Sequence, residues 1–186
     1  MTQTYDAIVI GSGQAGPFLA VEMAKAGWKT ALIEQEHLGG TCVNDGCTPT
    51  KTLVASAKVA HMARRAAEFG VTTGPVTIDM AAIKARKARI VGDSVGSLTR
   101  WIESTQNLTL IRGHASFEGP HEVSVNGQRL TAEKIFLNVG GRAVMPDWPG
   151  LAGAGALPRD GDAIDSTADH DDLEMLAVEP RALIDG

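Results

Sequence analysis

The chain has little cysteine, few aromatic side chains, no excess of positive charge and no long apolar run. Only two of its 186 residues are cysteine, 4% are aromatic, and the formal net charge is −5. A negative balance gives no electrostatic reason to bind nucleic acid or an anionic membrane. No stretch reaches the roughly 18 apolar residues of a membrane-spanning helix, and no signal peptide precedes the first predicted strand. We therefore expect a cytoplasmic protein with neither nucleic acid nor membrane as a partner.

The two cysteines, Cys42 and Cys47, stand five positions apart. This spacing does not match a structural zinc site, and the histidines are scattered without ligand spacing, so we predict no metal site. In a regular helix the two Cα atoms would be about 7.5 Å apart, beyond the roughly 7 Å limit for a disulfide. If the thiols meet, the backbone is distorted between them, which Gly46 and Pro49 permit. The alternative is two buried thiols that never meet.

A glycine-rich motif lies between a predicted strand at 7–10 and a predicted helix at 17–26, and a second strand at 30–33 ends at Glu34. A strand, a glycine turn and a helix, followed by an acid about 20 residues later, form the pattern of a dinucleotide-binding unit. The turn lets the backbone approach a pyrophosphate, and the helix N-terminus supplies N–H groups for the phosphates. The residues predicted to bind the cofactor here are Gly11, Ser12, Gly13, Gln14, Ala15 and Gly16.

Glu34 narrows the choice of cofactor. A carboxylate at this position accepts a hydrogen bond from a ribose 2′-hydroxyl and would repel the 2′-phosphate of NADP. FAD and NAD both remain, but an NAD-dependent dehydrogenase without flavin would leave the two cysteines without a role. The cysteine pair begins eight residues after Glu34, and a flavin can both accept hydride and reduce a disulfide, which favours FAD.

These two segments together resemble one family. The glycine motif with Glu34, and the run 39–51 that contains both cysteines, are similar to class I pyridine nucleotide-disulfide oxidoreductases. The resemblance is greatest to the mercuric reductase-like, FAD-containing branch, because of Thr-Pro-Thr-Lys at 48–51 and Val-Gly-Gly-Arg at 139–142. It implies an α/β fold: a Rossmann-like FAD-binding domain with a parallel sheet, a helical excursion and a small antiparallel β insertion.

The resemblance also implies roles for single residues. Cys42 matches the thiol that meets the substrate, Cys47 the thiol that lies against the flavin, and Lys51 a lysine near the flavin. A positive charge there would stabilise reduced flavin. The other residues that match FAD contacts are Ala15, Gly40, Thr41, Ala115 at the adenine end, and Gly140 in the segment that closes over the cofactor.

The remaining pattern predicts the rest of this domain. Helices are predicted over 48–69 and over 80–103, the second with Asp79 as its N-cap. A strand is predicted at 108–112, and the dipeptide Asn126-Gly127 between 123–125 and 129–131 predicts a hairpin. A further apolar strand is predicted at 134–139.

We divide the chain into an FAD-binding domain at 1–150 and a connection at 151–186 toward an NAD(P)H-binding domain that this sequence does not contain. The resemblance implies an enzyme that passes electrons from NAD(P)H through flavin to the cysteine pair, and on to a small-molecule or disulfide substrate, with mercuric reductase-like chemistry. The alternatives are a dihydrolipoyl dehydrogenase-like enzyme and a non-catalytic flavin-binding fragment. The resemblance also implies that the full-length protein is a homodimer. We expect the present chain to be a truncated N-terminal portion, inactive by itself, with a sheet edge or apolar surface exposed.

Overall fold

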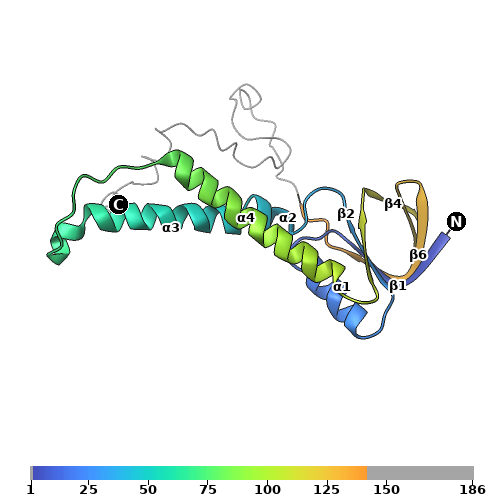
Figure 1. The fold of residues 1–186 in the computed structure, drawn as a ribbon. Helices are drawn as coiled ribbons and strands as arrows, with labels where there is room; N and C mark the ends of the chain where they lie inside the picture. Colours follow the sequence, from blue (N-terminus) through green and yellow to red (C-terminus); the bar gives the residue numbers. More distant parts are fainter. Residues whose placement is uncertain (1, 142–186) are drawn as a thin grey trace, which may run out of the picture.

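A six-stranded sheet forms the centre of the fold in the computed structural model, which describes residues 2–141 (Figure 1). Its strand order is β3-β2-β1-β6-β5-β4. Strand β1 pairs in parallel with β2 and β6, and β2 pairs in parallel with β3, whereas β5 runs antiparallel to β4 and β6. The strands are β1 Thr2–Ile10, β2 Thr30–Glu34, β3 Leu108–Arg112, β4 Ala115–Gly119, β5 Glu122–Val125 and β6 Gln128–Leu137. The predicted α/β fold is confirmed.

Two long helices form a hairpin that projects away from the sheet (Figure 1). The predicted helix over 48–69 is present as α3 followed by a short 3-10 turn, and the predicted helix over 80–103 is α4. The Asp79 carboxylate accepts a hydrogen bond from the N–H of Ala82 at 2.9 Å, so its predicted role as N-cap is confirmed. The helices are α1 Gly16–Lys25, α2 Gly40–Asn44, α3 Cys47–Arg64, the 3-10 helix Ala66–Phe69 and α4 Met80–Glu103.

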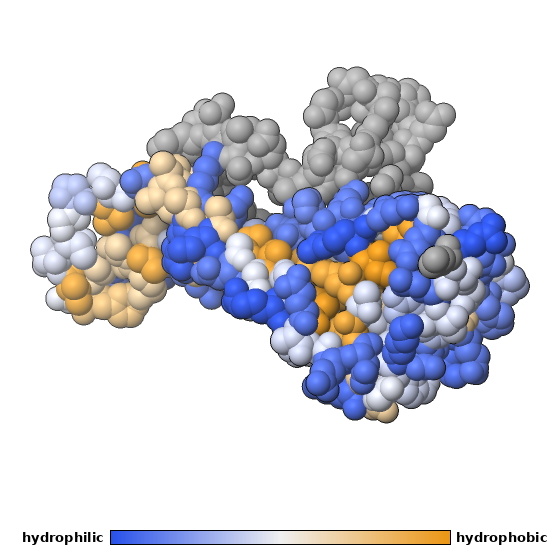
Figure 2. Space-filling model, turned by 45° about the vertical axis from the view of Figure 1, so that its right-hand side comes forward, coloured by the Kyte–Doolittle hydropathy of each residue, from blue (hydrophilic) through white to orange (hydrophobic). Residues whose placement is uncertain are grey.

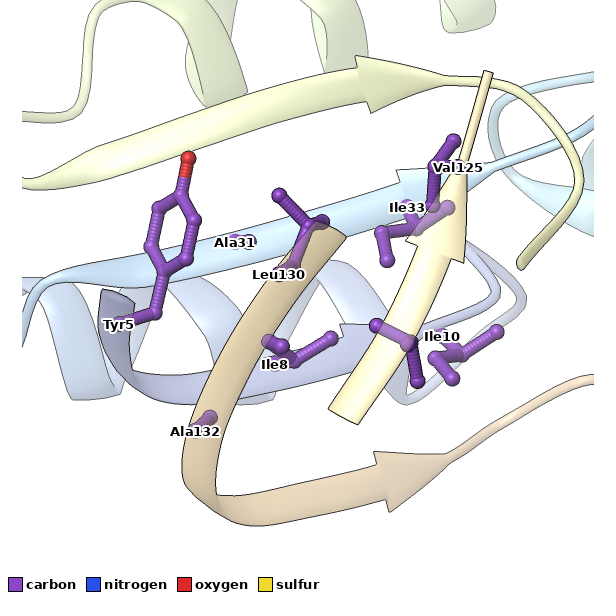
Figure 3. Close-up of a cluster of buried hydrophobic side chains, with 9 residues drawn as sticks. Tyr5, Ile8, Ile10, Ala31, Ile33, Val125, Leu130 and Ala132 are labelled. Atoms are coloured by element: carbon purple, nitrogen blue, oxygen red, sulfur yellow. The ribbon is translucent and has the colours of Figure 1, made fainter. Parts of the chain in front are cut away.

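The core lies on both faces of β1, as expected for a strand with a strand on each side. On one face, Ile8 and Ile10 point toward Leu130 of β6 and Val125 of β5 (Figure 3). On the other face, Val9 packs in a second cluster whose further buried members are Ala20, Leu32, Leu38 and Ile102. Because helices α1 and α4 both contribute to this second cluster, it attaches the helical layer to the sheet.

The strands near the end of the described chain differ from those that the sequence predicts. The segments 129–131 and 134–137, predicted as parts of separate strands, belong to one strand, β6, which ends at Leu137 and not at 139 as predicted. Its first half pairs with β5 through a turn in which Asn126 and Gly127 have φ values of 52° and 77°, so the predicted hairpin is confirmed. The whole strand also pairs with β1 from Thr2 onward, which explains why β1 begins five residues before the predicted apolar run. Pairing on two sides overrides the weak strand signal of these polar residues.

Several large apolar side chains are exposed on the described part of the chain. From the side shown in Figure 2, hydrophobic surface gathers on the helical hairpin and near the middle of the molecule. The most exposed of these side chains are Val59, Phe69, Leu137 and Val139. None of the helices within residues 2–141 is long and apolar enough to cross a bilayer. The predicted connection at 151–186, and the last nine residues of the predicted domain at 1–150, lie outside the described residues.

Candidate functional site

The glycine motif forms a tight turn between β1 and α1 in which main-chain atoms nearly touch. Gly11 has a φ of +99°, and a Cβ added to it would lie 2.2 Å from the main-chain oxygen of Asn138. A Cβ added to Gly16 would lie 2.1 Å from the main-chain oxygen of Gly11. Side chains are therefore excluded at these two positions, and Gln14 and Ala15 at the tip of the turn are exposed. This is the geometry that a phosphate group needs in order to approach backbone N–H groups.

The Glu34 side chain is nearly buried at the end of β2, with 9% of its surface exposed. One of its oxygens, Oε2, accepts hydrogen bonds from the N–H and the hydroxyl of Ser12 at 2.8 and 2.6 Å, and Oε1 accepts one from the N–H of Glu36 at 2.8 Å. Burial acts to raise the pKa of this carboxyl, but the hydrogen bonds from Ser12 and from main-chain N–H groups outweigh it, so the pKa is lowered. The group is thus a fixed anion beside the turn, and it disfavours a second anion such as a ribose 2′-phosphate.

Ser12 also connects the turn to the segment that carries the cysteines. The N–H of Gly39 donates to the main-chain oxygen of Ser12 at 3.1 Å and lies 3.3 Å from its hydroxyl oxygen. A Cβ added to Gly40 would lie 2.9 Å from the Cα of Gly13, so these two backbones are in direct contact. Cys42 follows two residues later in α2. The glycine turn and the segment that carries the cysteine pair are therefore in contact.

The helix is interrupted between the two cysteines, as their spacing predicted. Cys42 lies in α2, which ends at Asn44, and Cys47 is the first residue of α3. Gly46 adopts a φ of −114° and a ψ of −105°, outside the helical region, and its N–H donates to the main-chain oxygen of Thr41 at 2.6 Å. Pro49 lies in the first turn of α3, where its missing N–H costs no helical hydrogen bond. The break allows two side chains five positions apart to face each other.

The two thiols interact with each other in the structure. Both are free cysteines, Cys42 half-buried and Cys47 exposed. A hydrogen bond with the Cys47 thiol, together with partial burial, raises the pKa of Cys42. The main-chain N–H of Cys47 and the positive charge of Lys51 act in the opposite direction. The influence of Cys47 on Cys42 indicates that the two side chains lie near each other, and the structure holds both as free thiols.

The remaining predicted cofactor residues come from three separate segments. Thr41 is exposed on α2, one residue before Cys42. Ala115 begins β4, and two residues before it the N–H of Gly113 donates to the main-chain oxygen of Glu34 at 2.9 Å. Gly140 follows β6 with a φ of +71°. Thr41 and Gly140 each follow a residue or segment that contacts the turn, and Ala115 follows Gly113, which contacts Glu34; the roles of all three toward FAD stay predictions. No group of three or more metal-binding side chains gathers within residues 2–141.

Asn138 is the functional candidate that the sequence analysis did not identify. Its main-chain N–H donates to the oxygen of Ile10 at 2.7 Å, which places the residue directly under the glycine turn. With its amide oxygen facing the turn, the side chain accepts hydrogen bonds from the N–H of Gly16 at 2.9 Å and of Gly13 at 3.3 Å. The only sequence signal was a polar residue at the end of an apolar strand, beside a glycine pair.

Comparisons with known proteins agree with this geometry. The sequence model of the family described as pyridine nucleotide-disulphide oxidoreductase matches residues 5–184. A dihydrolipoyl dehydrogenase of Acholeplasma laidlawii is 34% identical over 81% of this chain and 45% of its own length. A mercuric reductase of Bacillus cereus is 31% identical over 98% of this chain and 27% of its own length.

A solved structure gives the same result for the fold. The HOCl-induced flavoprotein disulfide reductase RclA from Escherichia coli superimposes with a TM-score of 0.65 and 37% identity, over 80% of this chain and 31% of that protein. The chain thus spans less than half the length of these relatives. The predicted family is confirmed, and with it FAD and NAD(P)H as the cofactors that the family uses. The protein belongs to the pyridine nucleotide-disulphide oxidoreductase family.

Proposed function

We propose that this chain forms the FAD-binding, dithiol-bearing part of an oxidoreductase that takes electrons from NAD(P)H and passes them through Cys42 and Cys47 to a substrate. One observation carries the proposal: the segment that holds the thiol pair is packed directly on the nucleotide turn. Gly40 contacts Gly13, and Gly39 donates to Ser12. A redox pair at this place lies beside whatever ring system extends from a nucleotide bound in the turn.

The residues fit FAD as the bound group. Within residues 2–141 the N–H groups of Gln14 and Ala15 donate to no main-chain acceptor, so both are available to a pyrophosphate. Glu34 offers a buried carboxylate to a ribose hydroxyl at the adjacent strand end. FAD, when bound, supplies the two-electron chemistry that joins NAD(P)H oxidation to disulfide reduction. Lys51, one helical turn after Cys47, would add a positive charge to this region.

The thiol pair would then act as the exchange site. In its reduced form, the Cys42 thiolate attacks one sulfur of a substrate disulfide, and the other sulfur leaves as a thiolate. Cys47 next attacks the Cys42 sulfur of the mixed disulfide and releases the second substrate thiolate. The substrate has gained two electrons, and Cys42 and Cys47 are left as a disulfide. The influence of the Cys47 thiol on the pKa of Cys42 supports this second step, which needs the sulfurs to be neighbours.

Two kinds of relative suggest candidate substrates. A mercuric reductase matches 98% of the chain, in keeping with the mercuric reductase-like chemistry that the sequence resemblance implies. Several relatives are dihydrolipoyl dehydrogenases, so a small disulfide is the second candidate. We further propose that the whole protein acts as a homodimer in the cytoplasm.

Flavin binding and thiol reactivity in the full 186-residue chain test this proposal. We expect purified protein reconstituted with FAD to stay yellow through gel filtration, and mild reduction with dithiothreitol to produce a long-wavelength absorbance from a thiolate beside the flavin. Cys47→Ser should abolish this band, whereas Cys42→Ser, the matched control, should keep it. Protein that binds FAD without any thiol-dependent band would indicate the non-catalytic flavin-binding alternative. Protein that binds no FAD would contradict the proposal.

A further inference from the structure

Asn138 lies beneath the glycine turn without having been predicted as part of it. It follows β6, 127 positions after Gly11, and is half-buried. The close approach of its main-chain oxygen to Gly11 leaves no room for a side chain there. The turn is therefore shaped by a residue from the neighbouring strand as well as by its own glycines.

The Asn138 side chain replaces a cap that helix α1 lacks. Ala15, at the N-cap position of α1, has no side chain that accepts a hydrogen bond. The first turn of a helix leaves N–H groups without partners inside the helix. The amide of Asn138 is assigned with its oxygen toward the turn, because this orientation places an acceptor against the N–H groups of Gly16, the first residue of α1, and of Gly13. In the opposite orientation its Nδ2 donates to the main-chain oxygen of Gly11 at 3.4 Å. In the assigned orientation, Asn138 thus gives an acceptor to two N–H groups of the turn, and the N–H groups next to them stay available to a phosphate.

The N–H groups of residues 12–16 thereby fall into three sets. That of Ser12 donates to Glu34, and those of Gly13 and Gly16 donate to Asn138. Those of Gln14 and Ala15 have no main-chain acceptor in the described part of the chain. Because asparagine carries no charge, this arrangement satisfies the helix end and leaves its positive dipole end available to a ligand.

We propose that Asn138 is a positioning residue that caps α1 and fixes the turn so that the N–H groups of Gln14 and Ala15 face the pyrophosphate. This inference rests on the proposed function. The inference requires a neutral hydrogen-bond acceptor at residue 138. An anionic side chain there would keep the cap on α1 but weaken phosphate binding, whereas an apolar side chain would remove the cap.

The test compares Asn138→Asp with Asn138→Ala in the full chain, and uses Gln128→Glu as the control. Gln128 begins the same strand at its opposite end, so this control adds the same charge to β6 away from the turn. Thermal unfolding reports the cap. Calorimetric binding of ADP and of adenosine separates phosphate recognition from ribose and adenine recognition, because adenosine lacks the phosphates.

We expect Asn138→Asp to keep the wild-type Tm and to weaken ADP binding about tenfold or more, with adenosine binding unchanged. Asn138→Ala should lower the Tm by roughly 3–8 °C, and Gln128→Glu should change neither ligand's affinity. Any one of three results would overturn this inference and leave the proposed function standing. They are wild-type ADP affinity in Asn138→Asp, an equal loss of affinity for ADP and adenosine in that variant, and an unchanged Tm in Asn138→Ala. If the wild-type chain binds neither FAD nor ADP, the proposed function is overturned and this inference with it.

Discussion

Replacing Gly11 by alanine perturbs the closest main-chain contact at the turn. The new methyl group would lie 2.2 Å from the main-chain oxygen and 2.6 Å from the carbonyl carbon of Asn138. Neither atom can move like the end of a flexible side chain, because Asn138 is held by its hydrogen bond to Ile10. The φ of +99° at Gly11 is also unfavourable for alanine, at a cost of about 1 kcal/mol.

The size of the effect follows from these two terms. Overpacking a rigid site costs about 1–3 kcal/mol, which together with the backbone strain gives a loss of about 2–4 kcal/mol. Domains of this size have a free energy of unfolding of about 5–15 kcal/mol. We therefore expect Gly11→Ala to fold, with a clearly lower midpoint in urea unfolding followed by far-ultraviolet circular dichroism.

Gly92→Ala provides the matched control. Gly92 lies inside α4, and nothing would come within 4 Å of an added Cβ. Alanine in a helix interior is favoured over glycine by about 0.8–1 kcal/mol, so this variant should be more stable than the wild type. A Gly11→Ala free energy of unfolding within 1 kcal/mol of the wild type, or an equal loss in both variants, would refute the steric argument.

Three further predictions concern other contacts. Glu34→Gln should lower the free energy of unfolding by about 1–3 kcal/mol at neutral pH, because an amide cannot accept at both ends from Ser12 and Glu36. The pKa of Glu34 is lower in the folded protein than its ordinary value of 4.5, so ionised Glu34 contributes its full stabilisation above pH 4.5 and loses it as the pH falls below that value. In urea unfolding at acid pH, the difference in unfolding free energy between the wild type and Glu34→Gln should therefore shrink. Cys47→Ala should lower the pKa of Cys42, measured as a shift of its iodoacetamide alkylation profile toward lower pH; an unchanged profile would contradict the thiol contact. Asp79→Ala should cost about 1 kcal/mol of unfolding free energy, whereas Asp79→Asn should cost little.

Local chemistry made much of the fold predictable. The bounds predicted for β3 and α4 agree with the structure. A change in hydrophobic periodicity marks β3 in the sequence, and a capping aspartate marks the start of α4. The hairpin turn needs positive φ at Asn126 and Gly127, which these two residue types tolerate best. The break between the cysteines followed from helix geometry once the two thiols were expected to meet. Each of these features depends on residues within a few positions of one another.

The features that were not predicted depend on contacts between distant segments. The polar start of β1 is a strand only because β6 pairs with it, with Thr2 opposite Arg129. The same pairing sets the register that brings Asn138 beside Ile10 and under the glycine turn. A one-residue slip in this register would move the Asn138 side chain to the other face of the sheet. Its role therefore could not be read from its neighbours in sequence.

The hydrogen bonds of Glu34 limit how a ribose can be held. An ionised carboxylate offers about four acceptor positions, and the two groups of Ser12 with the N–H of Glu36 already use three of them. Little acceptor capacity remains, so a bound ribose hydroxyl would share this carboxylate with Ser12. Because Ser12 is also bonded to Gly39, the segment leading to Cys42 keeps its place whether or not the ribose is bound. The site is in this sense formed before the nucleotide arrives, which lowers the ordering cost of binding.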